Sequence, residues 1–207
     1  MPQKIAIIDY GVGNLHSVYK KLLQLKVDVF ITNSPKEIAA ADKLVLPGIG
    51  HFGKGMQNLK TLSLIDCLHE EVITNKKPIL GICLGMQLMA RCSQEAPEEK
   101  GLGWLDSQVV RFQVKDPLRF KIPHIGWNQL GIRKENALMQ NISPSTEFYF
   151  CHSYHFGDIN ACSVLSETNY DYPFVSAVAQ DNIFGVQFHP EKSHEQGIIV
   201  FQNFLNF

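Results

Sequence analysis

Cys83 is the residue whose surroundings point most directly to chemistry. It lies in Gly81-Ile82-Cys83-Leu84-Gly85, where a short apolar run ends and a helical pattern begins. A nucleophile on a sharp turn between a strand and a helix projects out of the backbone and is accessible to a substrate. Glycines on both sides let the two backbones approach closely, and the amide of Leu84 can then donate to an oxyanion. The pattern therefore predicts a cysteine nucleophile.

Burial in the core is the alternative role for any cysteine, because a free thiol packs like a small apolar side chain. We expect that structural role for the other four: Cys67, Cys92, Cys151 and Cys162. At Cys83 the glycine pair, and the positive end of the following helix, favour a reactive thiolate instead. Five cysteines are an odd number and include no CxxC pair, so neither a disulfide framework nor a zinc site is expected.

A cysteine nucleophile requires a base, and His189 has the most suitable position among the eight histidines. It directly follows the strand-like run 183–188 and precedes Pro190 and Glu191. Side chains two residues apart in an extended segment point to the same side, so Glu191 is expected to orient the imidazole. A structural histidine at a strand end is the alternative, and the presence of Cys83 in the same chain favours the catalytic pair.

The segment Pro47-Gly48-Ile49-Gly50 follows the third predicted strand. Two glycines in a tight turn suit a loop whose backbone amides face a developing negative charge, so we expect a second oxyanion donor here, beside Leu84. An ordinary loop with a phosphate site is the alternative. The sequence has no GxxxxGK[ST] motif, which argues against that alternative.

The first ninety residues alternate short apolar runs with helical patterns, which predicts a parallel, doubly wound sheet. Strands are expected at 5–8, 27–31, 43–46 and 79–82, and helices at 15–25, 36–41, 55–75 and 84–90. After a charged loop at 93–100, short alternating or aromatic segments predict antiparallel strands in a second sheet. These are expected at 107–114, 128–132, 147–153, 161–167, 176–180 and 183–187, followed by a closing helix at 197–207.

The expected fold class is therefore α/β, with a three-layer, mostly parallel doubly wound central sheet and an additional antiparallel sheet. Because no linker or repeat interrupts the chain, residues 1–207 are expected to form a single domain. The composition is 45% hydrophobic and 19% charged, with a net charge of −1. This excludes a disordered chain and a basic nucleic-acid binder.

No stretch reaches the roughly 18 apolar residues that span a bilayer, and the amino-terminal apolar run is shorter than a signal-peptide core. We therefore expect a cytoplasmic protein with reduced thiols, which contacts neither membrane nor nucleic acid.

Three ordered motifs resemble the class I (triad-type) glutamine amidotransferases: Pro-Gly-Ile-Gly at 47–50, Gly-Ile-Cys-Leu-Gly-Met-Gln at 81–87 and Phe-His-Pro-Glu-Lys-Ser at 188–193. The resemblance covers nearly the whole chain and implies a flavodoxin-related amidotransferase domain. Finer features at 7–15, 122–128 and 148–154 resemble the glutaminase subunits of imidazole glycerol phosphate synthases.

The resemblance implies that Cys83 attacks the carboxamide of L-glutamine to form a glutamyl thioester and release ammonia. His189 would act as base and then acid, Glu191 would orient it, and amides of Ile49 and Leu84 would hold the oxyanion. The family positions that hold glutamine match Gly50, Gln87, Glu95, His152 and Ser153.

The resemblance also implies a heterodimer with a (β/α)8 barrel synthase (cyclase) subunit, which uses the ammonia to make imidazole glycerol phosphate and AICAR in histidine biosynthesis. The residues in motifs that face this partner and its ammonia channel are Asn14, Trp127, Tyr154 and Lys192. No metal or organic cofactor is needed on this subunit.

Two histidines depart from the commonest histidine-pathway pattern: His155 after Tyr154, and His194 after Ser193. Both resemble a related branch that supplies ammonia to a sugar amidotransferase in lipopolysaccharide or surface-sugar biosynthesis. Surface variation is the alternative explanation, since loop positions tolerate change.

A thiol peptidase of the same fold and a non-catalytic binding module are further alternatives. The glutamine-binding motifs disfavour the first, and the complete Cys83, His189 and Glu191 set disfavours the second.

Overall fold

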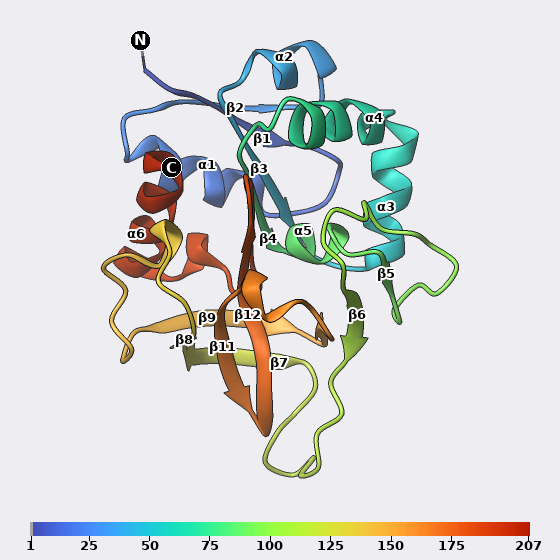
Figure 1. Cartoon of the computed structure of the whole chain (residues 1–207), viewed down its shortest axis with the longest axis vertical. Coiled ribbons are helices and arrows are strands. Elements are labelled where there is room, and N and C mark those ends of the chain that lie inside the picture. Colours follow the sequence, from blue (N-terminus) through green and yellow to red (C-terminus); the bar gives the residue numbers. More distant parts are fainter. Residues whose placement is uncertain (1) are drawn as a thin grey trace.

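Two sheets organise the computed structural model, which describes residues 2–207 (Figure 1). The larger has eleven strands in the order β2-β1-β3-β4-β13-β12-β10-β6-β5, with β11 paired to β12 and β8 to β11. The smaller pairs β7 with β9. The strands are β1 Lys4–Ile8, β2 Asp28–Thr32, β3 Lys43–Gly48, β4 Ile79–Cys83, β5 Cys92–Ser93, β6 Gln108–Arg111, β7 His124–Gln129, β8 Gly131–Ile132, β9 Glu147–His152, β10 Tyr154–Phe156, β11 Val164–Tyr170, β12 Tyr172–Gln180 and β13 Ile183–Val186.

The parallel half of the large sheet runs β2-β1-β3-β4-β13. This strand order is that of flavodoxin-like folds, in which ligands bind at the carboxyl ends of the strands. Gly48 at the end of β3 lies opposite Cys83 at the end of β4. Val186 in β13 lies opposite Ile82, so the chain after β13 emerges at the same edge. The register therefore brings three predicted motifs together.

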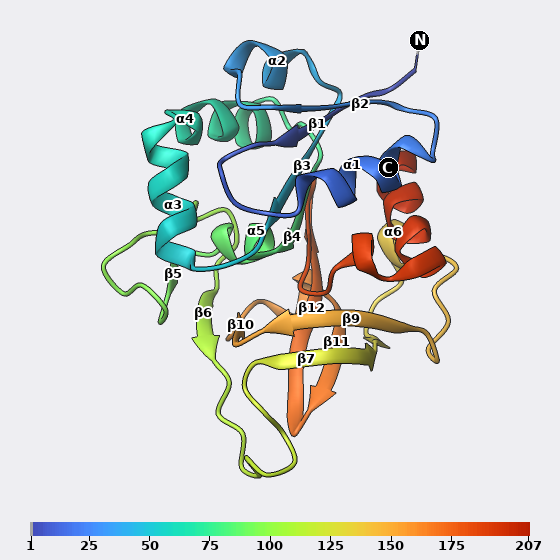
Figure 2. The same ribbon diagram turned by 180° about the vertical axis from the view of Figure 1, so that it is seen from behind.

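Helices cover both faces of the parallel strands, as Figures 1 and 2 show. The helical elements are α1 Leu15–Leu23, α2 Pro35–Ala40, α3 Phe52–Thr61, α4 Leu64–His69, α5 Leu84–Leu88 and α6 His194–Asn206. Alternate residues of β1 enter two cores: Ile5 and Ile7 pack with the residues of α1 and α6, whereas Ala6 and Ile8 pack with those of α3, α4 and α5. This division confirms the three-layer fold class.

Several predicted elements differ from the structure. The helix expected at 55–75 is broken, because Ser63 adopts a left-handed φ of 54° between α3 and α4, and a π-helical turn at Glu70–Thr74 follows α4. The segment 161–167 begins as the 3₁₀ turn Ala161–Ser163 before β11. The strand expected at 128–132 is wrong: β7 begins at His124 and ends at Gln129, and β8 is a separate strand.

The antiparallel assignment of the segment 183–187 is also wrong in part. β13 pairs antiparallel with β12 but parallel with β4, so it completes the parallel half of the sheet. Its continuous burial on both faces is typical of a parallel strand. β10, which sequence patterning did not predict, joins β12 to β6 and extends the sheet toward the charged loop.

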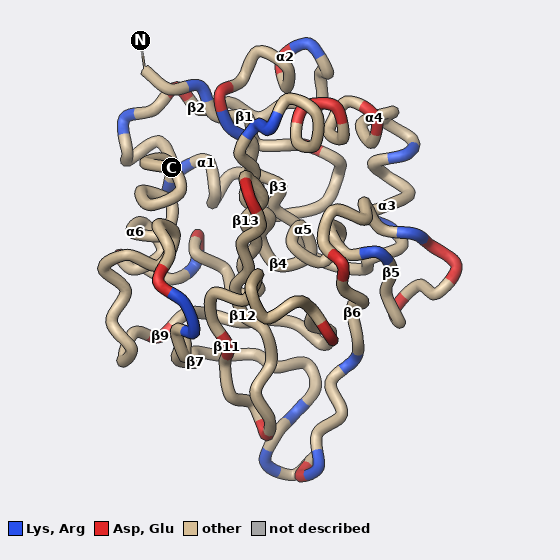
Figure 3. The backbone as a smooth tube through the Cα atoms, viewed as in Figure 1, with Lys and Arg blue, Asp and Glu red and all other residues tan. Residues whose placement is uncertain are grey.

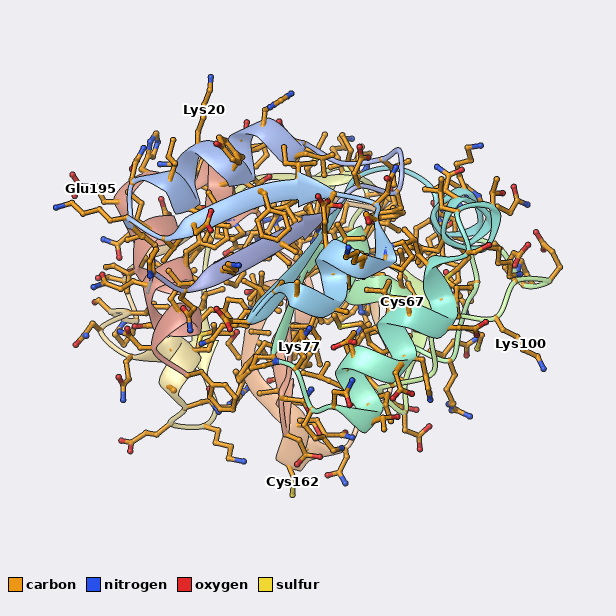
Figure 4. The ribbon with its side chains drawn as sticks, turned by 90° about the horizontal axis from the view of Figure 1, so that it is seen from above. Lys20, Cys67, Lys77, Lys100, Cys162 and Glu195 are labelled. Atoms are coloured by element: carbon orange, nitrogen blue, oxygen red, sulfur yellow. The ribbon has the colours of Figure 1, made fainter. Side chains whose placement is uncertain are left out.

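The expectation that the other four cysteines are buried in the core is wrong for Cys151 and Cys162. Cys151 and Cys162 are exposed and Cys67 and Cys92 are partly exposed, whereas Cys83 is buried. Cys151 lies on the outer face of β9, whose alternate residues point inward. Cys162 projects from the edge of the molecule (Figure 4). All five are free thiols.

Charges of both signs are scattered over the backbone view of Figure 3, and the loop between β6 and β7 carries a small group of basic residues at its tip. No helix within residues 2–207 is long and apolar enough to cross a membrane.

Candidate active site

Cys83 occupies a strained turn at the junction of β4 and α5. Its φ of 53° and ψ of −109° lie outside the regions that residues other than glycine usually adopt. Its neighbours must lack side chains: a Cβ on Gly85 would lie 1.7 Å from the carbonyl oxygen of Leu46, and one on Gly81 would lie 2.7 Å from the amide nitrogen of Met86. The predicted strand–turn–helix elbow is therefore present, and the glycine pair is what permits it.

The loop after β3 closes over this elbow. A Cβ on Gly48 would lie 2.3 Å from the Tyr10 hydroxyl and 2.9 Å from the Cβ of Leu84, so only glycine fits there. Gly50 has a φ of +104° with open space around it. Ile49 is 45% exposed, and both Ile49 and Leu84 line the cavity beside Cys83.

Gly48, Gly50 and Gly53 have the GxGxxG spacing, and they lie between a strand and a helix as in dinucleotide-binding loops. The helix terminus is already occupied, however, because a carboxylate oxygen of Glu95 accepts from the amide of Phe52 at 2.7 Å. A side-chain anion thus takes the position of a phosphate, which disfavours a phosphate-binding role.

His189 and Glu191 form a buried pair. Nδ1 of His189 lies 2.8 Å from Oε1 of Glu191, and the two side chains are 1% and 2% exposed. The predicted contact is confirmed, but the predicted geometry is wrong: Pro190–Lys192 forms a 3₁₀ turn rather than an extended segment. The Ser193 hydroxyl holds this turn by donating to the carbonyl of His189 at 2.6 Å.

Electrostatics favour a charged imidazole at His189. Burial disfavours the charged form, but the Cys83 thiolate and the Glu191 carboxylate outweigh it and raise the pKa of His189 to about 10. The ring's Nε2 is buried and makes no hydrogen bond to any residue of the range 2–207. It is therefore free to transfer a proton inside the cavity.

A cavity of about 360 Å³ joins these groups. Its volume falls in the range of small-molecule sites, about 300–1,000 Å³. Cys83 and His189 line it, and so do all five residues predicted to hold glutamine: Gly50, Gln87, Glu95, His152 and Ser153. Pro123 and Cys151, to which sequence analysis assigned no part in the site, also line it. Glu191 lies behind His189 and does not reach the cavity wall.

The four residues predicted to face a partner are spread over several elements. Tyr154 and Lys192 line the cavity. Trp127 on β7 is 43% exposed and stacks face to face on His194, with ring centres 5.0 Å apart. Asn14 caps α1 through a side-chain hydrogen bond to a backbone amide.

The two unexplained histidines have different surroundings. Surface variation is wrong for His155, which is buried: its Nε2 lies 2.9 Å from the Tyr172 hydroxyl and its Nδ1 lies 2.7 Å from the Phe156 carbonyl. Its ring packs on Phe112 with centres 4.6 Å apart, and burial lowers its pKa. His194 is exposed at the start of α6.

Sequence analysis missed Gln187, which lies beneath the cavity with no exposed surface. Its Nε2 donates to the Cys83 sulfur at 3.6 Å, and its Oε1 accepts from Gln87 at 3.0 Å. The available signal was a polar residue within an apolar run directly before Phe188-His189.

Acyl transfer through a cysteine requires a nucleophilic thiol, a base that a carboxylate orients, and backbone amides that can stabilise an oxyanion. One cavity here brings together a thiol on a strained elbow, an imidazole–carboxylate pair and loops that can supply such amides. The fold and this arrangement define the class of α/β enzymes with a cysteine elbow. No group of three or more His, Cys, Asp or Glu side chains that could hold a metal ion occurs within residues 2–207.

The family model described as glutamine amidotransferase class-I matches residues 6–207, and the chain belongs to this family. It is 46% identical over 201 residues to imidazole glycerol phosphate synthase subunit HisH 2 of Methanococcus maripaludis, covering 97% of this chain and 98% of that one. It is 43% identical over 201 residues to subunit HisH 2 of Pseudomonas aeruginosa, with the same coverage. Identity to subunit HisH 1 of Campylobacter jejuni is 44% over 203 residues, covering 97% and 98%.

Solved structures share the fold at low sequence identity. A glutamine amidotransferase crystal structure superposes with a TM-score of 0.76 at 18% identity, covering 98% of this chain and 97% of that one. PurLQS from Thermotoga maritima gives a TM-score of 0.75 at 18% identity, covering 100% and 99%.

Proposed function

We propose that this chain is a single-domain glutaminase subunit of a cytoplasmic imidazole glycerol phosphate synthase. It hydrolyses L-glutamine to glutamate and ammonia, and the ammonia passes to a (β/α)8 barrel synthase subunit that makes imidazole glycerol phosphate and AICAR. The observation that carries the proposal is the meeting of Cys83, His189 and the glutamine-motif residues in one cavity. The names of the relatives support histidine biosynthesis over a sugar amidotransferase as the recipient.

The first half of the reaction forms the thioester. His189 takes the proton of the Cys83 thiol, consistent with its raised pKa, and the sulfur attacks as the thiolate. The sulfur bonds to the carboxamide carbon, and the C=O electron pair moves to the oxygen, where the amides of Ile49 and Leu84 stabilise it. As the C–N bond breaks, His189 gives its proton to the nitrogen and ammonia leaves.

The second half restores the site. Neutral His189 takes a proton from water, whose oxygen attacks the thioester carbon, and the C–S bond breaks to release glutamate and the thiolate. Glu191 keeps the imidazole oriented through the 2.8 Å hydrogen bond and balances its charge. No cofactor takes part in these steps.

The polar and charged residues that line the cavity would recognise glutamine. The Glu95 carboxylate is a charge partner for the substrate ammonium, and Gln87 and the backbone at His152 and Ser153 present polar groups beside it. The partner would dock near Trp127 and the cavity mouth, where Ile125 and Ile49 are exposed apolar side chains.

Ammonia release from glutamine, measured with the synthase subunit and its ligand present, tests this proposal. Cys83→Ala should abolish it while the protein stays folded. Cys162→Ala is the matched control, because that thiol is exposed and Cys162 does not line the cavity; it should retain activity. Full activity in Cys83→Ala contradicts the proposal.

A further inference from the structure

A chain of hydrogen bonds ends on the Cys83 sulfur. Gln187 Nε2 donates to Sγ at 3.6 Å. Gln87 Nε2 donates both to Gln187 Oε1 at 3.0 Å and to the carbonyl oxygen of Tyr154 at 2.8 Å. The same carbonyl lies 2.8 Å from Nδ1 of His152. The nucleophile is therefore connected through side chains of α5 and β9 to groups outside its own turn.

The Tyr154 carbonyl fixes the direction of this chain, because a carbonyl oxygen only accepts. The part of the Gln87 amide that faces it must be the NH₂ group, and this group also faces Gln187. Gln187 must then present its oxygen to Gln87, which leaves its own NH₂ group toward Cys83. A hydrogen-bond donor thus faces the sulfur.

At the Tyr154 carbonyl the direction of donation reverses, because His152 donates to the same oxygen as Gln87. Because Nδ1 of His152 donates, its Nε2 is an acceptor, and Nδ1 of His124 lies 3.4 Å from it. Nε2 of His124 in turn lies 3.4 Å from the amide nitrogen of Asn128. Burial lowers the pKa of His124 to about 4 and holds that of His152 well below its ordinary value, so both rings are neutral at pH 7.

The position of Gln187 is set by the strands. It directly follows β13, whose Val186 lies opposite Ile82, and its backbone N–H donates to the carbonyl of Ser176 at 2.9 Å. A side-chain amide with no exposed surface is costly to bury unless both of its ends are hydrogen-bonded. Gln87 satisfies the oxygen, and the Cys83 sulfur is the partner of the nitrogen.

We propose that Gln187 is a catalytic residue that stabilises the Cys83 thiolate by donating a hydrogen bond to its sulfur, and that Gln87 is a positioning residue that holds the Gln187 amide in this orientation. The inference rests on the proposed role of Cys83 as the nucleophile. Hydrogen bonds to an ionised acceptor are roughly twice as strong as those between neutral groups, so this donor favours the reactive form of the thiol.

Alkylation of Cys83 by iodoacetamide tests the proposal on the full chain, without glutamine or partner. Mass spectrometry of the peptide that contains Cys83 separates it from the other four thiols. Gln187→Met removes the donor at similar length and should slow alkylation at pH 7 by about tenfold. At about pH 10, where an ordinary thiol is ionised, the two rates should converge. Gln187→Glu should react more slowly still at pH 7, because a carboxylate repels the thiolate.

Gln180→Met is the control, since Gln180 is exposed at the end of β12; its rate should equal that of the wild type. The proposal is wrong if Gln187→Met is alkylated at the wild-type rate at pH 7, or if its deficit is the same at every pH, which indicates a purely structural effect. Because the assay needs no turnover, its outcome is independent of whether the wild type shows glutaminase activity.

A measurement on the native Gln187 covers the case in which its variants do not fold. The side-chain amide resonance of Gln187 in ¹⁵N-labelled protein should shift on Cys83→Ala and stay in place on Cys151→Ala. An unmoved resonance in Cys83→Ala overturns the proposal.

Discussion

The close approach of β3 and α5 should set the geometry of the active site, and Gly85→Ala tests this directly. A Cβ on Gly85 would lie 1.7 Å from the carbonyl oxygen of Leu46 and 2.7 Å from its carbonyl carbon. Both contacts are to backbone, so the strand and the helix must separate by about 1.3 Å for the first contact to reach 3.0 Å. That movement displaces the Leu84 amide at the start of α5, and with it Cys83, which joins β4 to α5.

Overpacking of this kind costs about 1–3 kcal/mol, and more where backbone must move, while a misplacement of about 1 Å at a reacting centre costs roughly 100-fold in rate. We therefore expect Gly85→Ala to lower the free energy of unfolding by about 3 kcal/mol and the synthase-stimulated glutaminase rate by about 100-fold. Urea denaturation followed by circular dichroism measures the first, and ammonia release measures the second.

Gly131→Ala is the matched control. Gly131 lies on β8, away from the cavity, and its Cβ would lie 3.2 Å from the carbonyl oxygen of Glu167 on β11. It should change the free energy of unfolding by less than about 1 kcal/mol and leave the activity intact. If Gly85→Ala were as stable and as active as this control, the close approach would not be what positions the nucleophile.

Three further outcomes are expected. Tyr10→Phe should leave the thermal unfolding midpoint unchanged or raise it, because the Tyr10 hydroxyl is buried without a hydrogen-bond partner in the described part of the chain. A loss of more than about 2 kcal/mol in the free energy of unfolding would show that the hydroxyl does have a partner. The pKa of His189 should fall from about 10 in Cys83→Ala, because burial then opposes the charge without the thiolate; a ring titration by NMR that gives the wild-type value contradicts this. Glutaminase activity should decline as the pH rises through about 10, where His189 loses the proton that it gives to ammonia; a rate that stays constant through this range contradicts the assigned acid.

The parts of the site predicted from sequence are those encoded locally. The apolar run before Cys83 and its flanking glycines predict both the buried strand and the elbow, because the period of a strand and the space that glycine leaves are properties of a few consecutive residues. The pairing of His189 with Glu191 was predicted for the same reason, although Pro190 starts a 3₁₀ turn and brings the two side chains together by a different route.

The parts that escaped prediction depend on contacts between distant segments. The role of Gln187 requires β13 to lie beside β4, a parallel pairing that the local pattern does not encode. The bounds of β7 were predicted wrongly because His124 and Trp127 do not fit an apolar–polar alternation. Its ends are set by pairing with β9 rather than by its own residues. The burial of His155 likewise arises from β6 and β12 packing around it.

Detection of the glutamyl thioester tests the central claim most directly. The chain and its synthase partner, acid-quenched during turnover of glutamine, should yield a peptide containing Cys83 that carries the mass of one glutamyl group. The peptide containing Cys151 should be unmodified. Ammonia release at the full rate with no adduct on Cys83 at any time of quenching would contradict covalent catalysis at this residue.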